Sequence, residues 1–157
     1  MGLAAEYRAA CRDERVARLR RLLALRAMVA KGMTQRQIAG SLGISQPAVS
    51  QQLTSWPNAE HLHPELLLEA ASPVLTALAG ELGYTRLAAF GSVARGDART
   101  DSDIDLLVEA PPGTSSFAFV RFKQLLEQVL GRDVDLVSYG GLKPRVDDDI
   151  RREAVLL

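Results

Sequence analysis

Cysteine is almost absent from this sequence of 157 residues, because Cys11 is the only one. A single cysteine excludes an internal disulfide and suits the reducing conditions of the cytosol. Apolar runs are short as well: none approaches the ~20 residues that a membrane-spanning helix needs, and no signal-peptide pattern is visible. We therefore expect a cytoplasmic protein that is neither secreted nor inserted into a membrane.

Net charge is also lacking, since 19 Lys and Arg residues balance 19 Asp and Glu residues. The two signs are distributed unevenly. Residues 1–56 hold nine basic and three acidic residues, whereas residues 57–157 hold ten basic and sixteen acidic ones. A basic front favours contact with a phosphate backbone, and an acidic back offers carboxylates for cations. The sequence therefore predicts two modules with different partners.

The most informative stretch covers residues 90–108. An apolar run typical of a buried strand ends at Gly91, which lets the backbone approach a ligand, and Ser92 adds a hydroxyl and an N–H. Apolar and acidic residues then alternate, so Asp103 and Asp105 project from one strand face. Alone, such a pair is more often a solvated strand end. Beside a Gly-Ser turn it favours a divalent cation between the carboxylates, and Mg²⁺ bound in this way usually also contacts substrate phosphates.

This stretch resembles the nucleotidyltransferase superfamily of the DNA polymerase beta type. Its signature is Gly-Ser, a spacer of about ten residues and then D-x-D, and here Gly91-Ser92 is followed by residues 93–102 and then Asp103-Ile104-Asp105. The wording GSVARGDARTDSDIDLLV is most similar to the minimal nucleotidyltransferases. The resemblance implies a small mixed β-sheet flanked by helices. It also implies transfer of a nucleoside monophosphate, with ATP as the expected donor, to an acceptor hydroxyl.

The superfamily uses a third carboxylate on a later strand, and the resemblance assigns it to Asp135. Asp133 is the rival, although its place at the strand entrance favours a turn residue. By the same resemblance, Asp103, Asp105 and Asp135 would hold Mg²⁺ and act catalytically, with Asp135 helping to deprotonate the acceptor hydroxyl.

The resemblance also implies which residues would contact the nucleotide. Gly91 and Ser92 would bind the departing phosphates. Arg95 and Arg99 would neutralise phosphate charge, and a plain surface role is an equal alternative for both.

The first third of the sequence predicts helices. Residues 13–31 carry apolar and arginine side chains at helical spacing, which predicts a helix. We expect residues 1–12 to be either a frayed start or a lead-in to that helix. Thr34 and Gln37 form the capping-box pattern of a second helix, and Ser45 caps a third. Residues 34–56 resemble the helix-turn-helix of phage-repressor-like regulators. In that pattern the apolar positions face inward, and here they are Ile38, Ala39, Leu42, Ile44, Val49 and Leu53.

The third helix carries the prediction of DNA binding. Its outward side chains are Ser45, Gln46, Ser50, Gln51 and Thr54. Glutamine and serine are suited to contact base edges and phosphates. A helical scaffold that only packs or dimerises is the alternative.

We expect the fold class α+β, with an all-α helix-turn-helix followed by a small mixed sheet flanked by helices. The expected domains are residues 1–56 for the helix-turn-helix, 57–71 for a linker and 72–157 for the nucleotidyltransferase. His61 and His63 lie in the linker, where solvated side chains are favoured over a metal site. Residues 64–71 of the linker are compatible with a short helix that exposes residues 66–68 to a partner or to the other domain, and Ser72-Pro73 predicts the start of the next helix. The further expected elements are strands 86–90, 103–109 and 133–138 and helices 116–130 and about 144–156.

The family resemblance implies partners as well. Minimal nucleotidyltransferases are often antitoxins paired with HEPN-domain ribonuclease toxins, and some adenylylate a tyrosine of the toxin. We therefore expect a HEPN toxin, a nucleoside triphosphate and DNA as partners, with repression of the protein's own operon. The alternative is a DNA-binding transcriptional regulator whose second domain binds a nucleotide or partner without turnover. The oligomeric state stays open, and a homo-oligomer is one option.

Overall fold

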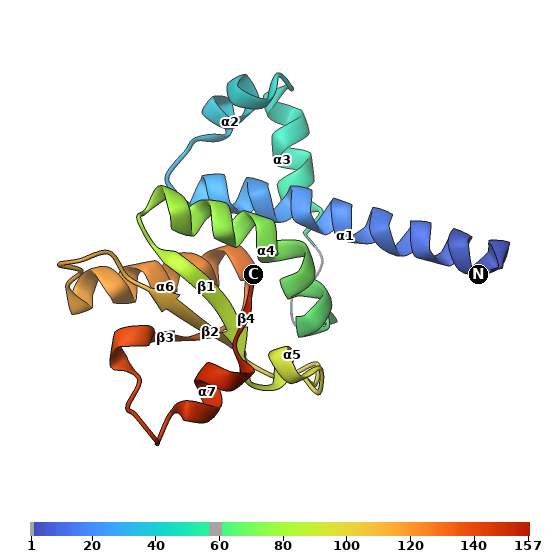
Figure 1. Cartoon of the computed structure of the whole chain (residues 1–157). Coiled ribbons are helices and arrows are strands. Elements are labelled where there is room, and N and C mark those ends of the chain that lie inside the picture. Colours follow the sequence, from blue (N-terminus) through green and yellow to red (C-terminus); the bar gives the residue numbers. More distant parts are fainter. Residues whose placement is uncertain (1, 57–60) are drawn as a thin grey trace.

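The computed structural model of the chain describes residues 2–56 and 61–157. Helices at the N-terminus precede a four-stranded mixed sheet, which confirms the predicted fold class (Figure 1). Residues 57–60 of the predicted linker lie outside the described residues. The elements are α1 (Leu3–Ala30), α2 (Gln35–Leu42), α3 (Gln46–Thr54), α4 (Pro64–Glu81), β1 (Thr85–Phe90), α5 (Gly91–Arg95), β2 (Ile104–Glu109), α6 (Ser116–Leu130), β3 (Val134–Ser138), the 3₁₀ turn η2 (Tyr139–Gly141), α7 (Asp148–Glu153) and β4 (Val155–Leu156).

Side-chain caps place the starts of α2 and α3 as the sequence predicts. The Thr34 side chain accepts the N–H of Gln37, whose side chain accepts the N–H of Thr34, so the capping box is complete. Ser45 accepts the N–H of Ala48 at the start of α3. Gly43 ends α2 in the left-handed region, at φ 68°, where a side chain would be strained.

The sheet has the strand order β3-β2-β1-β4. β1 pairs antiparallel with both β2 and β4, whereas β2 and β3 pair in parallel. Parallel neighbours need a crossover, and α6 supplies it between β2 and β3. This crossover brings the start of β3 beside the start of β2.

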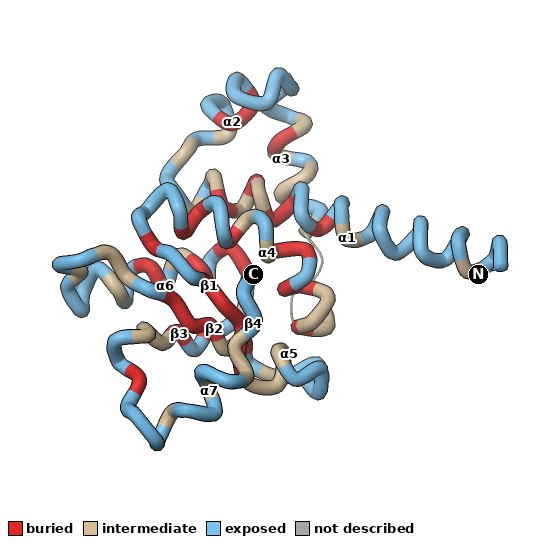
Figure 2. Tube along the Cα trace, viewed as in Figure 1, coloured by how far each residue is buried: buried red, intermediate tan, exposed pale blue. Residues whose placement is uncertain are grey.

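Helix α1 packs on both sides and so joins the two halves of the chain. Leu19 and Leu23 belong to the main core, which also contains α4, α6 and one sheet face. On its other side, Leu25 packs with Ile38 and Val49 of α2 and α3. Figure 2 shows the buried residues in the second half of α1, in contrast to its exposed first turns, which project beyond the rest of the molecule.

Alternation along the strands separates the two faces of the sheet. Leu106 and Val108 of β2 point into the main core, whereas Leu107 points to the opposite face. There it packs in a smaller cluster with Leu142 and, at its border, Ile150 from α7. Asp103 and Asp105 lie an even number of positions from Leu107 along the chain, so their side chains are on the same face of the sheet. That face is covered by the smaller cluster.

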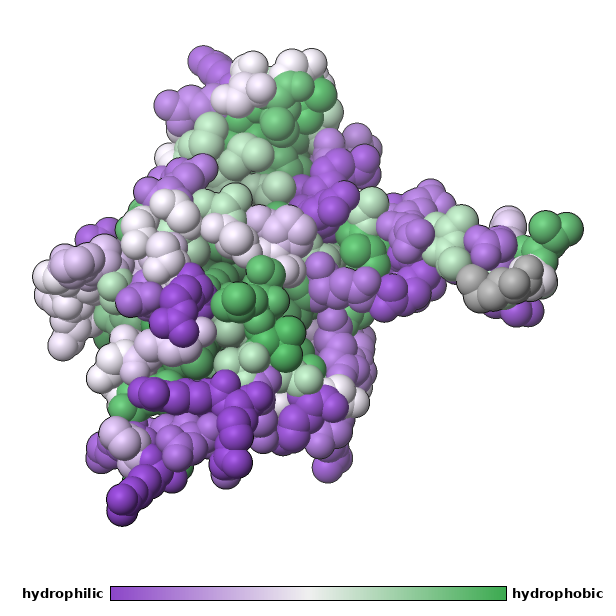
Figure 3. Space-filling view, in the orientation of Figure 1, coloured by the Kyte–Doolittle hydropathy of each residue, from purple (hydrophilic) through white to green (hydrophobic). Residues whose placement is uncertain are grey.

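The surface in Figure 3 is mixed, with hydrophilic residues gathered around the α7 segment and an apolar patch near the C-terminus. Val155 and Leu156 of β4 are exposed. Among residues 2–56 and 61–157, no helix combines the length and the apolar character that a membrane crossing requires.

The predicted helix start at Ser72-Pro73 is wrong, because α4 begins at Pro64 and continues through Pro73. Residues 64–71, expected in the linker, therefore form the first half of this helix. Proline costs an intrahelical hydrogen bond, but Leu67 and Leu75, on either side of it, are both fully buried. Burial of this shared apolar face outweighs the missing bond.

The C-terminal helix predicted over about residues 144–156 is also too long. α7 ends at Glu153, and the chain continues as β4. Val155 pairs with Ala89, and the N–H of Leu157 donates to the carbonyl of Leu87. The edge of β1 would otherwise present unpaired backbone groups, so pairing there is favoured over a further helical turn.

Two inward assignments in the predicted helix-turn-helix are wrong as well. Leu42 is 45% exposed and Ile44 is 38% exposed, although Ile38 and Val49 are fully buried as predicted. The helices α2 and α3 are short and pack against each other and against α1, which leaves the turn between them at the surface.

Candidate active site

Strand register brings the three predicted carboxylates to one end of the sheet. Asp105 lies opposite Asp135 in the parallel β2–β3 pair and opposite Phe90 in the antiparallel β1–β2 pair. Asp103 precedes β2 by one residue and shares the face of Asp105. Asp133, the rival third carboxylate, is exposed and precedes β3 by one residue, as Asp103 precedes β2. The geometry therefore groups Asp105 with Asp135, as predicted.

Gly91 forms a cradle for the Asp105 carboxylate. It follows β1 directly, begins α5 and has φ 70°. A Cβ at this position would overlap Asp105 Oδ2 and lie 3.2 Å from Asp105 Cγ. A side chain here would be strained at this φ and would have to displace the Asp105 carboxylate, so glycine is favoured. The predicted phosphate turn and the predicted metal-binding carboxylate are in direct contact.

Electrostatic crowding acts on Asp105. Burial raises the pKa of its carboxyl, the charges of Asp135 and Asp103 raise it further, and Arg95 opposes this by lowering it. Asp103 and Asp135 are exposed, whereas Asp105 is half-buried. The site thus concentrates negative charge around a carboxylate that is partly removed from solvent, and a cation would relieve this repulsion.

The donor set fits Mg²⁺. All three side chains supply hard carboxylate oxygens, which this ion prefers, and the Asp105 carboxylate packs against Gly91 of the adjacent turn. Among residues 2–56 and 61–157, no group of three or more His, Cys, Asp or Glu side chains is placed so that it could hold a metal ion by itself. Mg²⁺ usually takes only one or two carboxylates plus substrate phosphates, so an open set of this kind is compatible with it.

The predicted phosphate-neutralising arginines lie near the site in different settings. Arg95, at the end of α5, forms ion pairs with Asp97 at 3.4 Å and Glu153 at 3.2 Å. Arg99 is almost fully exposed and lies 3.7 Å from Asp101. Ser92, half-buried within α5, follows the cradle glycine. The nucleotide-binding assignments of these residues remain predictions.

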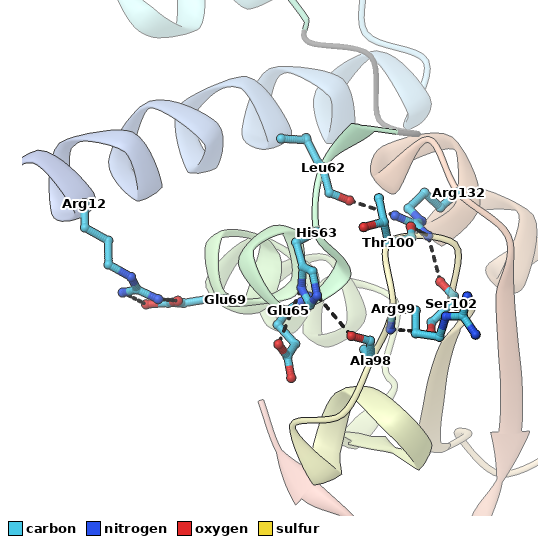
Figure 4. Close-up of polar contacts among 10 residues, drawn as sticks. All are labelled: Arg12, Leu62, His63, Glu65, Glu69, Ala98, Arg99, Thr100, Ser102 and Arg132. Carbon is cyan, nitrogen blue, oxygen red and sulfur yellow. Dashed lines mark hydrogen bonds and ion pairs between the residues drawn. The ribbon is translucent and has the colours of Figure 1, made fainter.

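Sequence reasoning missed the residues that hold the loop between α5 and β2. His63, interpreted as a solvated linker residue, caps α4 and contacts the Ala98 carbonyl at 3.0 Å (Figure 4). Arg132 donates to the carbonyls of Thr100 and Ser102, both at 2.7 Å. These contacts reach across 30 or more residues, and the only local signal was the position of Arg132 just before β3.

The predicted DNA-contacting side chains share the outer side of α3. Gln46, Gln51 and Thr54 are exposed, and Ser50 is half-buried. The Ser45 hydroxyl is occupied as the α3 cap, and the Thr54 hydroxyl donates to the Gln51 carbonyl. The two glutamines are thus the freest of the set to contact another molecule.

Carboxylates at one end of a mixed sheet, beside a glycine turn, are compatible with an enzyme that acts on nucleotide phosphates. A family model for the nucleotidyltransferase domain matches residues 74–157, more than half of the chain. The chain therefore belongs to the nucleotidyltransferase family and is a nucleotidyl-transfer enzyme. The match includes Gly91 and the three carboxylates of the site.

Individual relatives agree with this assignment. A candidate protein adenylyltransferase of Methanocaldococcus jannaschii is 45% identical over 73 residues, which cover 46% of this chain and 78% of the relative. The protein adenylyltransferase MntA of Thermococcus cleftensis is 38% identical over 94 residues, covering 57% of this chain and 95% of the relative. A solved structure of a candidate minimal nucleotidyltransferase is 42% identical with a TM-score of 0.56, covering 62% of this chain and 98% of that one.

Proposed function

We propose that this chain is a Mg²⁺-dependent protein adenylyltransferase that transfers AMP from ATP to a hydroxyl of a partner protein. The observation that carries the proposal is the carboxylate cluster on an open sheet face. Asp103 and Asp135 are exposed, so a hydroxyl on a macromolecule can approach them from solvent. The protein adenylyltransferase names of two relatives support the same acceptor class.

The residues have distinct roles in this reaction. The acceptor oxygen forms a bond to the α-phosphorus of ATP, and the bond between that phosphorus and the pyrophosphate oxygen breaks. Asp135 accepts the hydroxyl proton. Gly91 and Ser92 hold the departing phosphates with backbone N–H groups and the serine hydroxyl. Mg²⁺, held by Asp103 and Asp105 with Asp135, would supply charge neutralisation at the phosphates.

The partner in this proposal is a HEPN-domain ribonuclease toxin, and its tyrosine is the acceptor. The chain would then be its antitoxin. Residues 1–56 would form a DNA-binding domain that represses the operon. The exposed glutamines of α3 and the excess of basic over acidic residues in this segment support that part of the proposal.

Transfer can be tested with the purified full-length chain, a HEPN ribonuclease, Mg²⁺ and ATP. We expect intact mass spectrometry to show one adenylyl group added to the ribonuclease, with loss of its activity. The double variant Asp103→Asn with Asp105→Asn should lose transfer at least about a hundredfold, because it removes two charged ligands of the metal.

Asp101→Asn is the matched control, since Asp101 is an exposed acid two residues before Asp103. It should retain transfer. If the ribonuclease is blocked by stoichiometric binding while its mass never changes, the enzymatic antitoxin function is wrong. A regulator with a non-catalytic binding domain would then be the better description.

A further inference from the structure

The loop between α5 and β2 ends at Asp103 and is held from two sides. On one side, Arg132 Nη2 donates to the carbonyl oxygens of Thr100 and Ser102, each at 2.7 Å. On the other side, His63 Nε2 lies 3.0 Å from the carbonyl oxygen of Ala98. Figure 4 shows both side chains converging on this loop.

Arg132 lies just before β3, one of the two strands that carry the carboxylates. It follows Gly131, the left-handed cap of α6, and precedes Asp135 by three residues. A guanidinium has several N–H donors in a rigid fork and can hold two carbonyls at a fixed spacing. One side chain thus connects the entrance of β3 to the loop that leads into β2.

We propose that Arg132 is a positioning residue that sets Asp103 beside Asp105 and Asp135; the proposal rests on the nucleotidyl-transfer site described above. The peptide bond between Ser102 and Asp103 is planar, so the Ser102 carbonyl and the Asp103 Cα belong to one rigid unit. Holding the carbonyl oxygen therefore restricts the backbone of Asp103.

Charge explains why such a restraint is needed. Three carboxylates repel one another, and Asp103 lies outside the strand, at the end of a loop of exposed residues. An unrestrained loop would carry Asp103 away from Asp105 and lower this repulsion. Arg132 opposes that movement through hydrogen bonds of a charged donor, which are stronger than neutral ones.

The restraint extends to the segment before α4. Arg132 Nη1 donates to the Leu62 carbonyl at 2.9 Å. His63 Nδ1 lies 3.3 Å from the backbone N of Glu65 and 3.4 Å from its Oε2, while Nε2 lies 3.0 Å from the Ala98 carbonyl oxygen. Leu62 and His63 both precede residue 74, where the family match begins. The N-terminal part of the chain thus helps to support the catalytic loop.

The test compares Arg132→Met, Arg132→Lys and the control Arg121→Met in the full-length chain. Arg121 is an exposed arginine of α6, so its variant removes the same charge outside the loop contacts. Hydrogen exchange of the amides of residues 97–103 is measured in metal-free protein, and Mn²⁺ affinity is measured by calorimetry. Thermal melting shows that each variant is folded.

We expect Arg132→Met to speed amide exchange in the loop about tenfold and to weaken Mn²⁺ binding about ten- to a hundredfold, the usual range for residues that orient metal ligands. The Mg²⁺ concentration for half-maximal transfer should rise in parallel. Arg132→Lys keeps the charge but lacks the fork, so it should lie between wild type and Arg132→Met. Arg121→Met should match wild type.

Unchanged Mn²⁺ affinity in folded Arg132→Met would overturn the proposal, whether or not exchange in the loop changes. If Arg132→Met does not fold, Arg132→Lys decides, and wild-type exchange and affinity in that variant would have the same meaning. Failure of the wild-type chain to transfer AMP would instead contradict the proposed function. The loop measurement in metal-free protein does not depend on that outcome.

Discussion

Asp105 occupies the most crowded position among the three carboxylates. Its side chain lies against the backbone of Gly91, its strand partner is Asp135, and Asp103 stands two residues away on the same face. Burial and these like charges raise its pKa. The residue best placed to hold a cation is therefore also the one that most disfavours a negative charge when no cation is bound.

This balance predicts that Asp105→Asn stabilises the metal-free protein at neutral pH. A carboxyl whose pKa is raised by folding stabilises the folded state at pH values below its ordinary pKa of 3.8. That contribution is lost as the pH rises through the raised pKa. We expect a gain in Tm of less than about 3 °C at pH 7, since solvent screens a half-buried group and about 1 kcal/mol corresponds to roughly 2–4 °C at this size.

Calorimetric melting in a chelator, between pH 3.5 and pH 8, checks this prediction. The difference between variant and wild type should vanish at the acid end. Added Mg²⁺ should raise the Tm of wild type more than that of the variant. A variant that is less stable than wild type at every pH would contradict the account of Asp105 as a repelled charge.

Gly91→Ala should damage the site more than the fold. The left-handed backbone costs a side chain about 1–2 kcal/mol, and the new Cβ would also displace the Asp105 carboxylate. Gly43→Ala is a matched control, because Gly43 has nearly the same φ, 68° against 70°, with no atom within 4 Å of an added Cβ.

Both glycine variants should therefore lose similar stability in thermal melts. Only Gly91→Ala should lose nucleotidyl transfer, by about a hundredfold or more, because a displaced carboxylate no longer meets its partners. Equal transfer in the two variants would mean that the contact between Gly91 and Asp105 has no role in the reaction.

At the scale of elements, local patterns predicted most of the catalytic sheet. The alternation from Asp103 onward gave β2, and the apolar spacing over residues 116–130 gave α6 with its observed bounds. The errors arose where tertiary packing decides. Pro73 lies inside a helix whose two halves share one buried face, and the last residues pair with β1 instead of extending α7.

The candidate site could be predicted only in part for the same reason. Asp103 and Asp105 follow from the period of one strand, whereas the role of Asp135 came from family resemblance. The contact of Gly91 with Asp105 depends on the register between β1 and β2, which local sequence does not determine. Arg132 and His63 act through backbone carbonyls, and carbonyls leave no residue pattern in a sequence.

At the scale of the whole molecule, helix α1 connects the basic segment, residues 1–56, to the acidic segment, residues 57–157. α1 packs against α2 and α3 on one side and against the main core, which contains α4, α6 and one sheet face, on the other. Arg26 of α1 donates to the carbonyls of Gln128 and Val129 at the end of α6 and lies over the ring of Trp56, 4.4 Å from its centroid. The basic and the acidic parts of the sequence therefore pack together in one structure.

The full-length chain should bind duplex DNA through the basic front, with an affinity that falls steeply as salt rises, because bound Lys and Arg release counterions. Gln46→Ala and Gln51→Ala should reduce discrimination between the native promoter and unrelated DNA by about ten- to a hundredfold while changing the salt slope little, since glutamine contacts bases and carries no charge.

Gln124→Ala, which changes an exposed glutamine of α6, serves as the control and should match wild type. Fluorescence anisotropy across a salt series measures both quantities. If full-length protein does not bind the promoter even at low salt, then α2 and α3 are a packing scaffold and the DNA-binding half of the proposal is wrong.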